Sequence, residues 1–455
     1  MDYPTTRDLV AALQAGRVSA VELLERSIAR IEAHDGRIHA VAVRDFERAH
    51  EAARAADAAL ARGERRPLLG VPLTVKEAFN VAGTPTTWGI PGTEHIPVMD
   101  DALLVRRLKG AGAVVIGKTN LAMQLADWQS DNPVYGRTCN PWDLGRTPGG
   151  SSGGGAAALA AGYVSLDFGS DLAGSLRVPA HCCGVFAHKP THGLVPMRGF
   201  APPGTPSLSV GVDLDLAVVG PMARCAGDLA LALDVVAGPD DAEAAAWRLA
   251  LPPARHGALE DFRVLVLDRH PKVPTSKAVR TRLARIADGL AAAGCKVARG
   301  SASPLLPDLA LVEATWRTLL MAVVGAEIGH RDWMESDRVR IGIAHQWREF
   351  FREWDVILCP VMPTPAFPHD GGDMHERRLL VDGEPMPYEA LPVWSSIATL
   401  TGLPATAMPI GLSDEGLPIG MQIVGPPLED RTTLAFADLV ERSFGGFVAP
   451  PGYAG

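Results

Sequence analysis

The most informative part of the chain is residues 169–191, GSDLAGSLRVPAHCCGVFAHKPT, which follow an apolar run at 164–168. The run predicts a buried strand, and the small residues at 173–175 predict a tight turn soon after it. Such a turn can aim several backbone N–H groups at one point, as stabilisation of an oxyanion requires. Asp171 and Arg177 flank the turn, where they either brace it or form an ordinary loop ion pair.

A second unusual segment, RTPGGSSGGG at residues 146–155, contains five glycines and two serines. Three interpretations are open. It can be a flexible linker, or the nucleophile elbow of an α/β hydrolase, since residues 149–153 fit G-x-S-x-G. It can also be a loop that opens the Ala-rich helix at 156–162 and brings backbone N–H groups close to a ligand. Strand-like neighbours argue against a linker, and the polar residues before the loop argue against an elbow.

Lysine is scarce in this chain, because arginine supplies most of the 43 basic residues. Lys76 lies inside the apolar run LLGVPLTVKEAF at 68–79. A lysine is rarely buried without a partner, and burial lowers its pKa from about 10.4 toward neutrality. Lys76 is therefore a candidate general base, and an outward-pointing lysine on an edge strand is the equal alternative.

Two further segments contain the residues of known binding motifs, but their residue types or spacing do not fit the structure that each motif requires. Residues 112–119, GAVVIGKT, fit the phosphate-loop pattern GxxxxGKT, yet their apolar and β-branched residues predict a strand. Residues 181–193, HCCGVFAHKPTHG, contain three histidines and two cysteines, but their spacing matches no zinc signature. We therefore predict no metal site and no cofactor.

The rest of the chain alternates between helical and strand-like runs. Helical runs occupy 6–16, 19–34, 45–63, 100–112 and 275–294, and strand-like runs occupy 113–118, 262–268, 354–364 and 416–425. This alternation is typical of an α/β protein built around a buried sheet.

The overall composition narrows the function classes. The 455 residues carry a formal net charge of −9, which argues against a dedicated nucleic-acid binder. The six cysteines form no CxxC pair, so reduced thiols are expected. The first residues contain no apolar signal segment, and the chain has no apolar run of about 18 residues. We expect a cytoplasmic protein that binds neither nucleic acid nor a membrane.

Taken together, these segments resemble the amidase signature family. The resemblance rests on GVPLTVKEAF at 70–79, TPGGSSGGGAAALAAG at 147–162 and the stretch at 169–191, supported by GAGAVVIGKTN at 110–120 and TGLPATAMPIGLSDEGLPIGMQIVG at 401–425. It covers nearly the whole chain, and the motifs in this order are far more specific than any of them alone. It implies a single α/β/α domain around a large mixed β-sheet at 66–455, with an N-terminal helical arm at 1–65 and a variable, substrate-shaping region at 236–350.

The family uses a Ser–cisSer–Lys triad, which the resemblance assigns to specific positions here. Ser175 corresponds to the nucleophile, Ser151 to the bridging serine after a cis peptide bond, and Lys76 to the base. The resemblance also assigns the oxyanion hole to the backbone amides of Leu172, Ala173, Gly174 and Ser175, and the supporting hydrogen bonds to Ser152, Ser170, Asp171 and Arg177. The chain departs from the family at Ala173 and Gly155, where Gly and Ser are frequent, and at Glu77, where Asp is common.

The resemblance implies an amide hydrolase that works through an acyl-enzyme. The segments that should shape the pocket are rich in tryptophan, and we predict a lining from Met123, Gln124, Trp128, Trp316 and Trp394. Aromatic walls favour aryl or alkyl amides, with carbamate or ester hydrolysis as a side activity; each tryptophan is equally compatible with a place in the core.

The expected partner is a small-molecule amide or carbamate, and a homodimer is the candidate assembly. Two alternatives remain. One is the glutamine-amidase subunit of a tRNA-dependent amidotransferase, and the other is a catalytically silent binding protein on the same fold.

Overall fold

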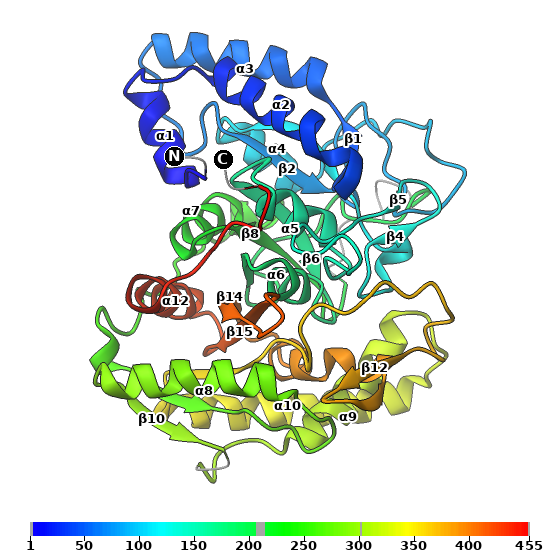
Figure 1. Ribbon diagram of the computed structural model, residues 1–455, viewed down its shortest axis with the longest axis vertical. Helices are drawn as coiled ribbons and strands as arrows, with labels where there is room; N and C mark the ends of the chain where they lie inside the picture. The colour runs from blue at the N-terminus through cyan, green and yellow to red at the C-terminus, as the bar shows by residue number, and fades with distance from the viewer. Residues whose placement is uncertain (1–2, 206–213, 301–302, 454–455) are drawn as a thin grey trace.

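The computed structural model describes residues 3–205, 214–300 and 303–453 (Figure 1). Across these residues, eleven strands form one mixed sheet. In spatial order the strands are β1 (Val41–Arg44), β3 (Val114–Thr119), β2 (Pro72–Lys76), β6 (Leu166–Asp171), β8 (Val218–Ala223), β7 (Phe186–Lys189), β14 (Ala405–Leu412), β15 (Pro418–Val424), β11 (Val356–Pro360), β9 (Arg263–Val266) and β10 (Lys296–Arg299). The expected α/β/α fold around a large mixed sheet is confirmed.

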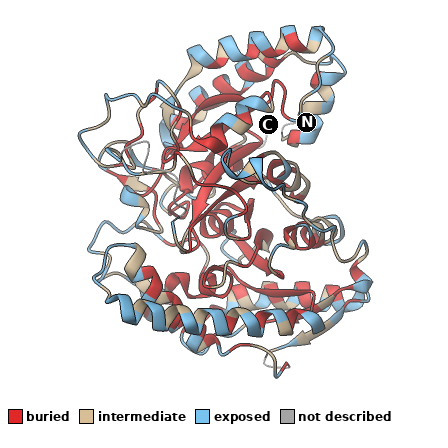
Figure 2. Ribbon diagram, turned by 180° about the vertical axis from the view of Figure 1, so that it is seen from behind, coloured by how far each residue is buried: buried red, intermediate tan, exposed pale blue. Residues whose placement is uncertain are grey.

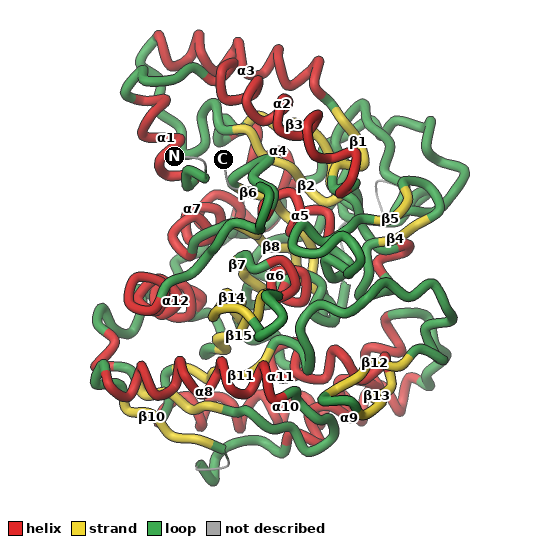
Figure 3. The backbone as a smooth tube through the Cα atoms, viewed as in Figure 1, coloured by secondary structure: helices red, strands yellow, loops and turns green. Residues whose placement is uncertain are grey.

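Helices cover both faces of this sheet (Figures 1 and 3). They are α1 (Thr6–Gln14), α2 (Ala20–Ile38), α3 (Phe46–Ala61), α4 (Leu103–Gly110), α5 (Gly153–Ala160), α6 (Arg177–Cys183), α7 (Ala226–Val236), α8 (Lys277–Ala292), α9 (Leu309–Val323), α10 (His330–Glu353), α11 (Ser396–Thr399) and α12 (Asp430–Phe444). One apolar core contains residues of α2, α3, α5 and α6, a second contains residues of α4, α7, α8 and α12, and a third contains residues of α9, α10 and α11. Buried residues fill the sheet, while exposed ones follow the outer faces of the helices (Figure 2).

Short elements complete the chain outside the main sheet. They are the hairpins β4 (Asp131–Asn132) with β5 (Gly136–Arg137) and β12 (Arg378–Val381) with β13 (Glu384–Pro387), and the 3₁₀ turns Met123–Leu125, Glu243–Ala245, Leu259–Asp261 and Tyr388–Ser395. The two chain ends lie together beside α1, where the Tyr3 hydroxyl donates to the Tyr453 carbonyl at 2.7 Å (Figure 1).

The N-terminal segment differs from the predicted helical arm in one respect. Its three helices form as expected, but β1 lies between α2 and α3 and pairs antiparallel with β3 at the edge of the main sheet. A four-residue strand has too short an alternation to be recognised between two amphipathic helices. Residues 3–65 therefore contribute a strand to the sheet as well as a helical cover.

The sequence-predicted strands and helices of the main domain are found where the periodicity placed them. The run at 113–118 overlaps β3, the run at 416–425 contains β15, and the helical run at 275–294 contains α8. Within the described residues, no helix combines the length with the apolarity needed to cross a bilayer.

Candidate active site

Lys76 is the last residue of β2, whose neighbours β3 and β6 run parallel to it on either side. Side chains alternate along a strand, so Leu73 and Val75 enter the core of one face while Thr74 and Lys76 point to the other. Lys76 is completely buried, and this burial lowers the pKa of its amine to about 7. The alternative of an outward-pointing edge lysine is thus excluded.

The Lys76 amine contacts two serine hydroxyls and lies in no ion pair within the described residues. Its Nζ is 2.6 Å from the Ser151 Oγ and 3.1 Å from the Ser170 Oγ. Ser151 follows Gly150 through a cis peptide bond, and its loop leads directly into α5. The glycine-rich segment is thus neither a linker nor a strand-to-helix elbow, because it is a buried loop held against the end of β2.

The turn that carries Ser175 follows β6 and is braced by a buried ion pair. Arg177 donates to both carboxylate oxygens of Asp171, at 2.9 and 3.0 Å, and both side chains are fully buried. Burial alone would raise the pKa of Asp171, but the guanidinium beside it lowers the pKa to about 2. Arg177 also donates to Gln422 at 2.8 Å and to Thr399 at 2.9 Å, so the turn is anchored to β15 and α11.

The backbone amides of this turn differ from the sequence expectation at one position. The Gly174 N–H donates to the Asp171 Oδ1 at 2.8 Å, so this amide is already occupied. For the amides of Leu172, Ala173 and Ser175, no acceptor is recorded among the described residues. Gly174 adopts a φ of 97°, and a Cβ there would lie 2.6 Å from the Ser395 Oγ. Three free N–H groups of the turn therefore remain for a ligand.

Ser175 and Ser151 line the same cavity together with Ser170. The Ser152 N–H donates to the Ser175 carbonyl at 3.2 Å, which ties the glycine-rich loop to the turn. The Ser152 hydroxyl is 3.3 Å from the Ser170 carbonyl. Within the described residues, no hydrogen bond joins the hydroxyls of Ser151 and Ser175.

Asp167 is a buried acid near the site that the motifs did not single out. It lies on β6 beside Thr74, on the same face of the sheet as Lys76. Its Oδ2 accepts from the hydroxyls of Thr74 at 2.7 Å and Thr119 at 3.2 Å, while its Oδ1 has no partner among the described residues. Burial raises its pKa to about 7. The available signal was an acidic residue inside the apolar run at 164–168.

The cavity in front of the serines has a volume of about 190 Å³. Its lining is mainly apolar and comes from loops, β6 and the end of α9: Trp88, Gln124, Leu125, Ala126, Ser151, Ser170, Asp171, Leu172, Ser175, Phe200, Leu214, Ala217, Val323 and Val324. Of the five predicted pocket residues, only Gln124 lines this cavity. The lining residues that no motif pointed to come from segments far apart in the chain: Trp88, Leu125, Ala126, Phe200, Leu214, Ala217, Val323 and Val324.

The other four predicted pocket residues lie elsewhere. Met123 is 44% exposed. Trp128 donates its indole N–H to the Ala173 carbonyl at 3.0 Å and thus contacts the turn from outside the cavity. Trp316 and Trp394 are fully buried in the core around α9 and α11. Large apolar rings there fill space between helices, so the interpretation as core residues is correct for both.

The phosphate-loop match and the segment rich in histidine and cysteine are both parts of the fold. Residues 114–119 form β3, so the phosphate-loop match is a strand. The ring of His181 lies between the carbonyls of Thr364, at 3.0 Å, and Gly420, at 3.3 Å. No group of three or more His, Cys, Asp or Glu side chains is arranged to hold a metal ion in the described parts of the chain.

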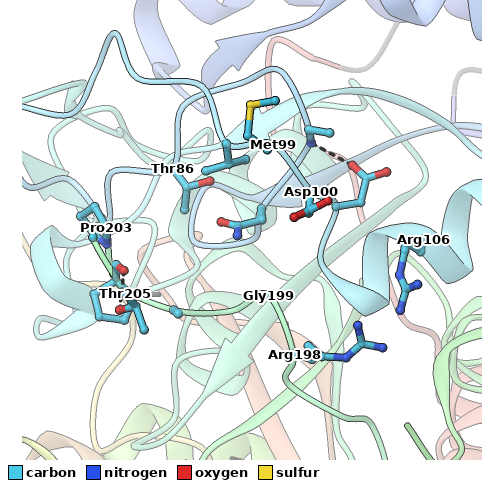
Figure 4. Close-up of a pocket in the computed structure, with 15 residues that line it drawn as sticks. Thr86, Met99, Asp100, Arg106, Arg198, Gly199, Pro203 and Thr205 are labelled. Carbon is cyan, nitrogen blue, oxygen red and sulfur yellow. Dashed lines mark hydrogen bonds between the residues drawn. The ribbon is translucent and has the colours of Figure 1, made fainter. Parts of the chain in front are cut away.

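A larger cavity, of about 600 Å³, lies beside Thr86, Met99, Arg106 and Arg198 (Figure 4). None of the predicted catalytic residues lines it. Arg106 pairs with Asp241, and Arg198 pairs with both Asp240 and Asp241, each at 2.7 Å, so the two positive charges are already neutralised. The candidate catalytic residues therefore belong to the smaller cavity.

The chain matches a known protein family along most of its length. The model of the Amidase family matches residues 22–313 and 309–434. The chain belongs to the amidase family. Enzymes of this family hydrolyse carbon–nitrogen bonds of amides, and the chain is a hydrolase of this class. The resemblance stated from the motifs is thereby confirmed.

The relatives of this amidase-family chain carry several activities. One subunit of the glutamyl-tRNA(Gln) amidotransferase of Anaeromyxobacter sp. (strain K) is 34% identical, over 98% of this chain and 97% of the relative. An indoleacetamide hydrolase of Bradyrhizobium diazoefficiens is also 34% identical, over 96% of this chain and 86% of the relative.

Solved structures share the fold. A chain from a vestigial protein complex that reveals the origins of an s-triazine catabolic enzyme matches with a TM-score of 0.84 at 30% identity, over 98% of this chain and 100% of that one. A bacterial aryl acylamidase matches with a TM-score of 0.82 at 23% identity, over 97% of this chain and 96% of that one.

Proposed function

We propose that this chain hydrolyses small aryl or alkyl amides through an acyl-enzyme on Ser175. One observation carries the proposal: the buried Lys76 amine, with its pKa lowered to about 7, is 2.6 Å from the Ser151 hydroxyl in a cavity that Ser175 also lines. A serine is a weak nucleophile without a base, and a neutral amine near physiological pH supplies one.

The proposed reaction begins with proton transfer from the Ser175 hydroxyl to Ser151 and from Ser151 to Lys76. The Ser175 Oγ attacks the amide carbon, and the carbonyl oxygen becomes an oxyanion that accepts from the free N–H groups of Leu172, Ala173 and Ser175. The C–N bond then breaks as Ser151 returns a proton to the leaving nitrogen. Water attacks the resulting ester, the acid departs, and Ser175 regains its proton.

Shape and polarity of the cavity support a small apolar acyl group. Its volume is about 190 Å³, and Trp88, Phe200, Leu125 and Val323 are among its walls. Burial of an aromatic ring against such walls is favourable and leaves no polar group unpaired. A carbamate or ester carbonyl presents the same electrophile to Ser175, so we include both as side activities.

The alternative of a glutamine-amidase subunit is supported by relatives that are subunits of amidotransferases. Glutamine carries an ammonium and a carboxylate that need charged partners once they leave water. Within the described lining, Asp171 is the only charged side chain, and Arg177 already neutralises it. We therefore favour an apolar amide over glutamine.

Ammonia release from a panel of amides tests the proposal. Purified protein should act on phenylacetamide and indoleacetamide, more slowly on acetamide, and least on glutamine, while Ser175→Ala should abolish all turnover. Ammonia from glutamine alone would establish the amidotransferase alternative. If no amide is hydrolysed and no serine-directed reagent labels Ser175, the protein is a silent binding protein. The homodimer stays a prediction, which sedimentation of the purified protein checks.

A further inference from the structure

Trp88 forms a wall of the catalytic cavity, and no sequence motif pointed to it. Its ring lies 5.0 Å from that of Phe200, and both side chains line the cavity. Trp88 adopts a φ of 54°, in the left-handed region, and so do Gln124 at 54° and Leu125 at 62°. All three line the same cavity. Non-glycine residues keep this conformation only where their surroundings impose it, and they cluster at functional sites.

Hydrogen bonds fix Trp88 through both its backbone and its ring. Its N–H donates to the Glu77 Oε2 at 3.0 Å, and its carbonyl accepts from the Gln124 N–H at 2.8 Å. The indole N–H donates to the Ala78 carbonyl at 3.2 Å. The ring is therefore held in one orientation, and the two left-handed segments of the wall are joined to each other.

Glu77 is the residue on which this arrangement depends. Its Oε1 accepts from the Thr87 N–H at 2.7 Å and from the Tyr135 hydroxyl at 3.0 Å. The carboxylate is fully buried and lies 3.8 Å from the equally buried Lys118 Nζ. Both carboxylate oxygens of Glu77 thus accept hydrogen bonds from the segment that carries Trp88. Glu77 directly follows Lys76, the proposed base, in the chain.

Lys118 supports the same segment from β3. It pairs in register with Val75, so its side chain lies on the face of the sheet opposite to Lys76. It donates to the Thr86 hydroxyl at 2.9 Å and to the Pro85 carbonyl. A buried ion pair contributes little to stability by itself, because desolvation offsets its attraction. The contacts of this pair instead concentrate on residues 85–88, the segment that carries Trp88.

We propose that Glu77, with Lys118 as its counter-ion, is a positioning residue that holds Trp88 against the acyl group of the substrate. In this role it sets the preference for aryl over small alkyl groups. The inference rests on the proposed function, because it assumes that Ser175 is the reacting residue in this cavity.

Two reagents that differ only in their organic group test the inference without a substrate. Phenylmethanesulfonyl fluoride and methanesulfonyl fluoride each form an Oγ–S bond with serine as the S–F bond breaks and fluoride leaves. The rate of labelling of Ser175, followed by mass spectrometry, gives an aryl-to-methyl ratio for each variant of the full chain. A general loss of folding or of the base would lower both rates, whereas a misplaced wall changes the ratio.

We expect the ratio to fall about tenfold or more in Glu77→Gln and in Trp88→Ala, because the phenyl rate should fall far more than the methyl rate. The double variant should show no larger fall than Trp88→Ala, since both changes act through one ring. Glu51→Gln, at an exposed position of α3, and Trp247→Ala, at a ring that is 47% exposed, serve as matched controls with the wild-type ratio.

A wild-type ratio in a folded Glu77→Gln, or additive effects in the double variant, would overturn the inference and leave the proposed function intact. If Glu77→Gln loses its cooperative thermal transition, Trp88→Ala decides alone, and a wild-type ratio there overturns the inference. Failure of both reagents to label the wild-type Ser175 overturns the proposed function and the inference together.

Discussion

Two buried lysines lie just outside the cavity that Ser175 lines: Lys76 contacts its serine side, here called the floor, and Lys118 lies behind the side that contains Trp88, here called the wall. On the floor, Lys76 contacts serine hydroxyls and no carboxylate within ion-pair distance among the described residues. Behind the wall, Lys118 lies 3.8 Å from Glu77 and donates to backbone and hydroxyl oxygens. Burial lowers both pKa values, to about 7 for Lys76 and about 8 for Lys118.

The difference lies in what surrounds each amine. Hydroxyl groups can accept a proton from one neighbour and pass it to another, so an amine among them can act as a base. An amine opposite a carboxylate keeps its proton and holds neighbouring segments in place. Burial of a lysine therefore does not reveal its role, and the contacts of its nitrogen do.

Among the variants that test this comparison, Lys76→Ala should have the largest effect on activity. We expect kcat to fall by roughly 10²–10⁴-fold with a small change in KM, because the base acts in the transition state. Steady-state kinetics on the best amide of the panel measures both, and Lys277→Ala, an exposed lysine of α8, is the control. A variant with wild-type kcat would leave the floor without its proposed base.

Arg177→Met tests how firmly the floor is held. It removes one partner of a fully buried ion pair and leaves the Asp171 carboxylate without its counter-ion. The expected loss is about 3–5 kcal/mol of unfolding free energy, measured by urea denaturation against wild type. Arg442→Met, at a side chain that is 69% exposed on α12, should change stability little. Equal stabilities of the two variants would contradict the bracing role of the pair.

The pH profile of the reaction tests the protonation state of Lys76. Since catalysis needs neutral Lys76, kcat/KM should rise as the pH increases through about 7. The Asp167 carboxylate favours the charged form of Lys76, so Asp167→Asn should lower the pKa of Lys76 and move the acid limb to lower pH. The facing Asp171 stays paired with Arg177 in both proteins. A profile that is flat down to pH 5, or a limb that moves the other way, would be inconsistent with this assignment.

The smallest effect is expected from Met123→Ala. Its side chain is 44% exposed and does not line the cavity, although it precedes Gln124, which does. KM for an aryl amide should stay within about twofold, and stability within about 0.5 kcal/mol. A large rise in KM would indicate that Met123 also contacts the substrate.

Much of the floor could be predicted from sequence, because its residues sit in short motifs with local causes. The sequence placed Lys76 inside an apolar run and left open whether its side chain is buried, and it placed the glycine-rich loop at the start of a helix, where Gly153 begins α5. Asp171, Ser175 and Arg177 share one turn, so their spacing brings them together without long-range packing. The oxyanion role expected of the Gly174 amide is the exception, because this N–H donates to the Asp171 carboxylate.

The amino-acid order alone predicted the α/β fold, the candidate catalytic residues and the family, since each leaves a signal in helix and strand periodicity or in a short motif. The tertiary structure decided the wall, where Trp88, Leu125, Phe200 and Val323 converge from separate segments. It also placed Trp316 and Trp394 in the core, because the amount of space between packed helices determines whether a ring is buried or lines a cavity. That space is a property of the whole fold and of no single stretch of residues.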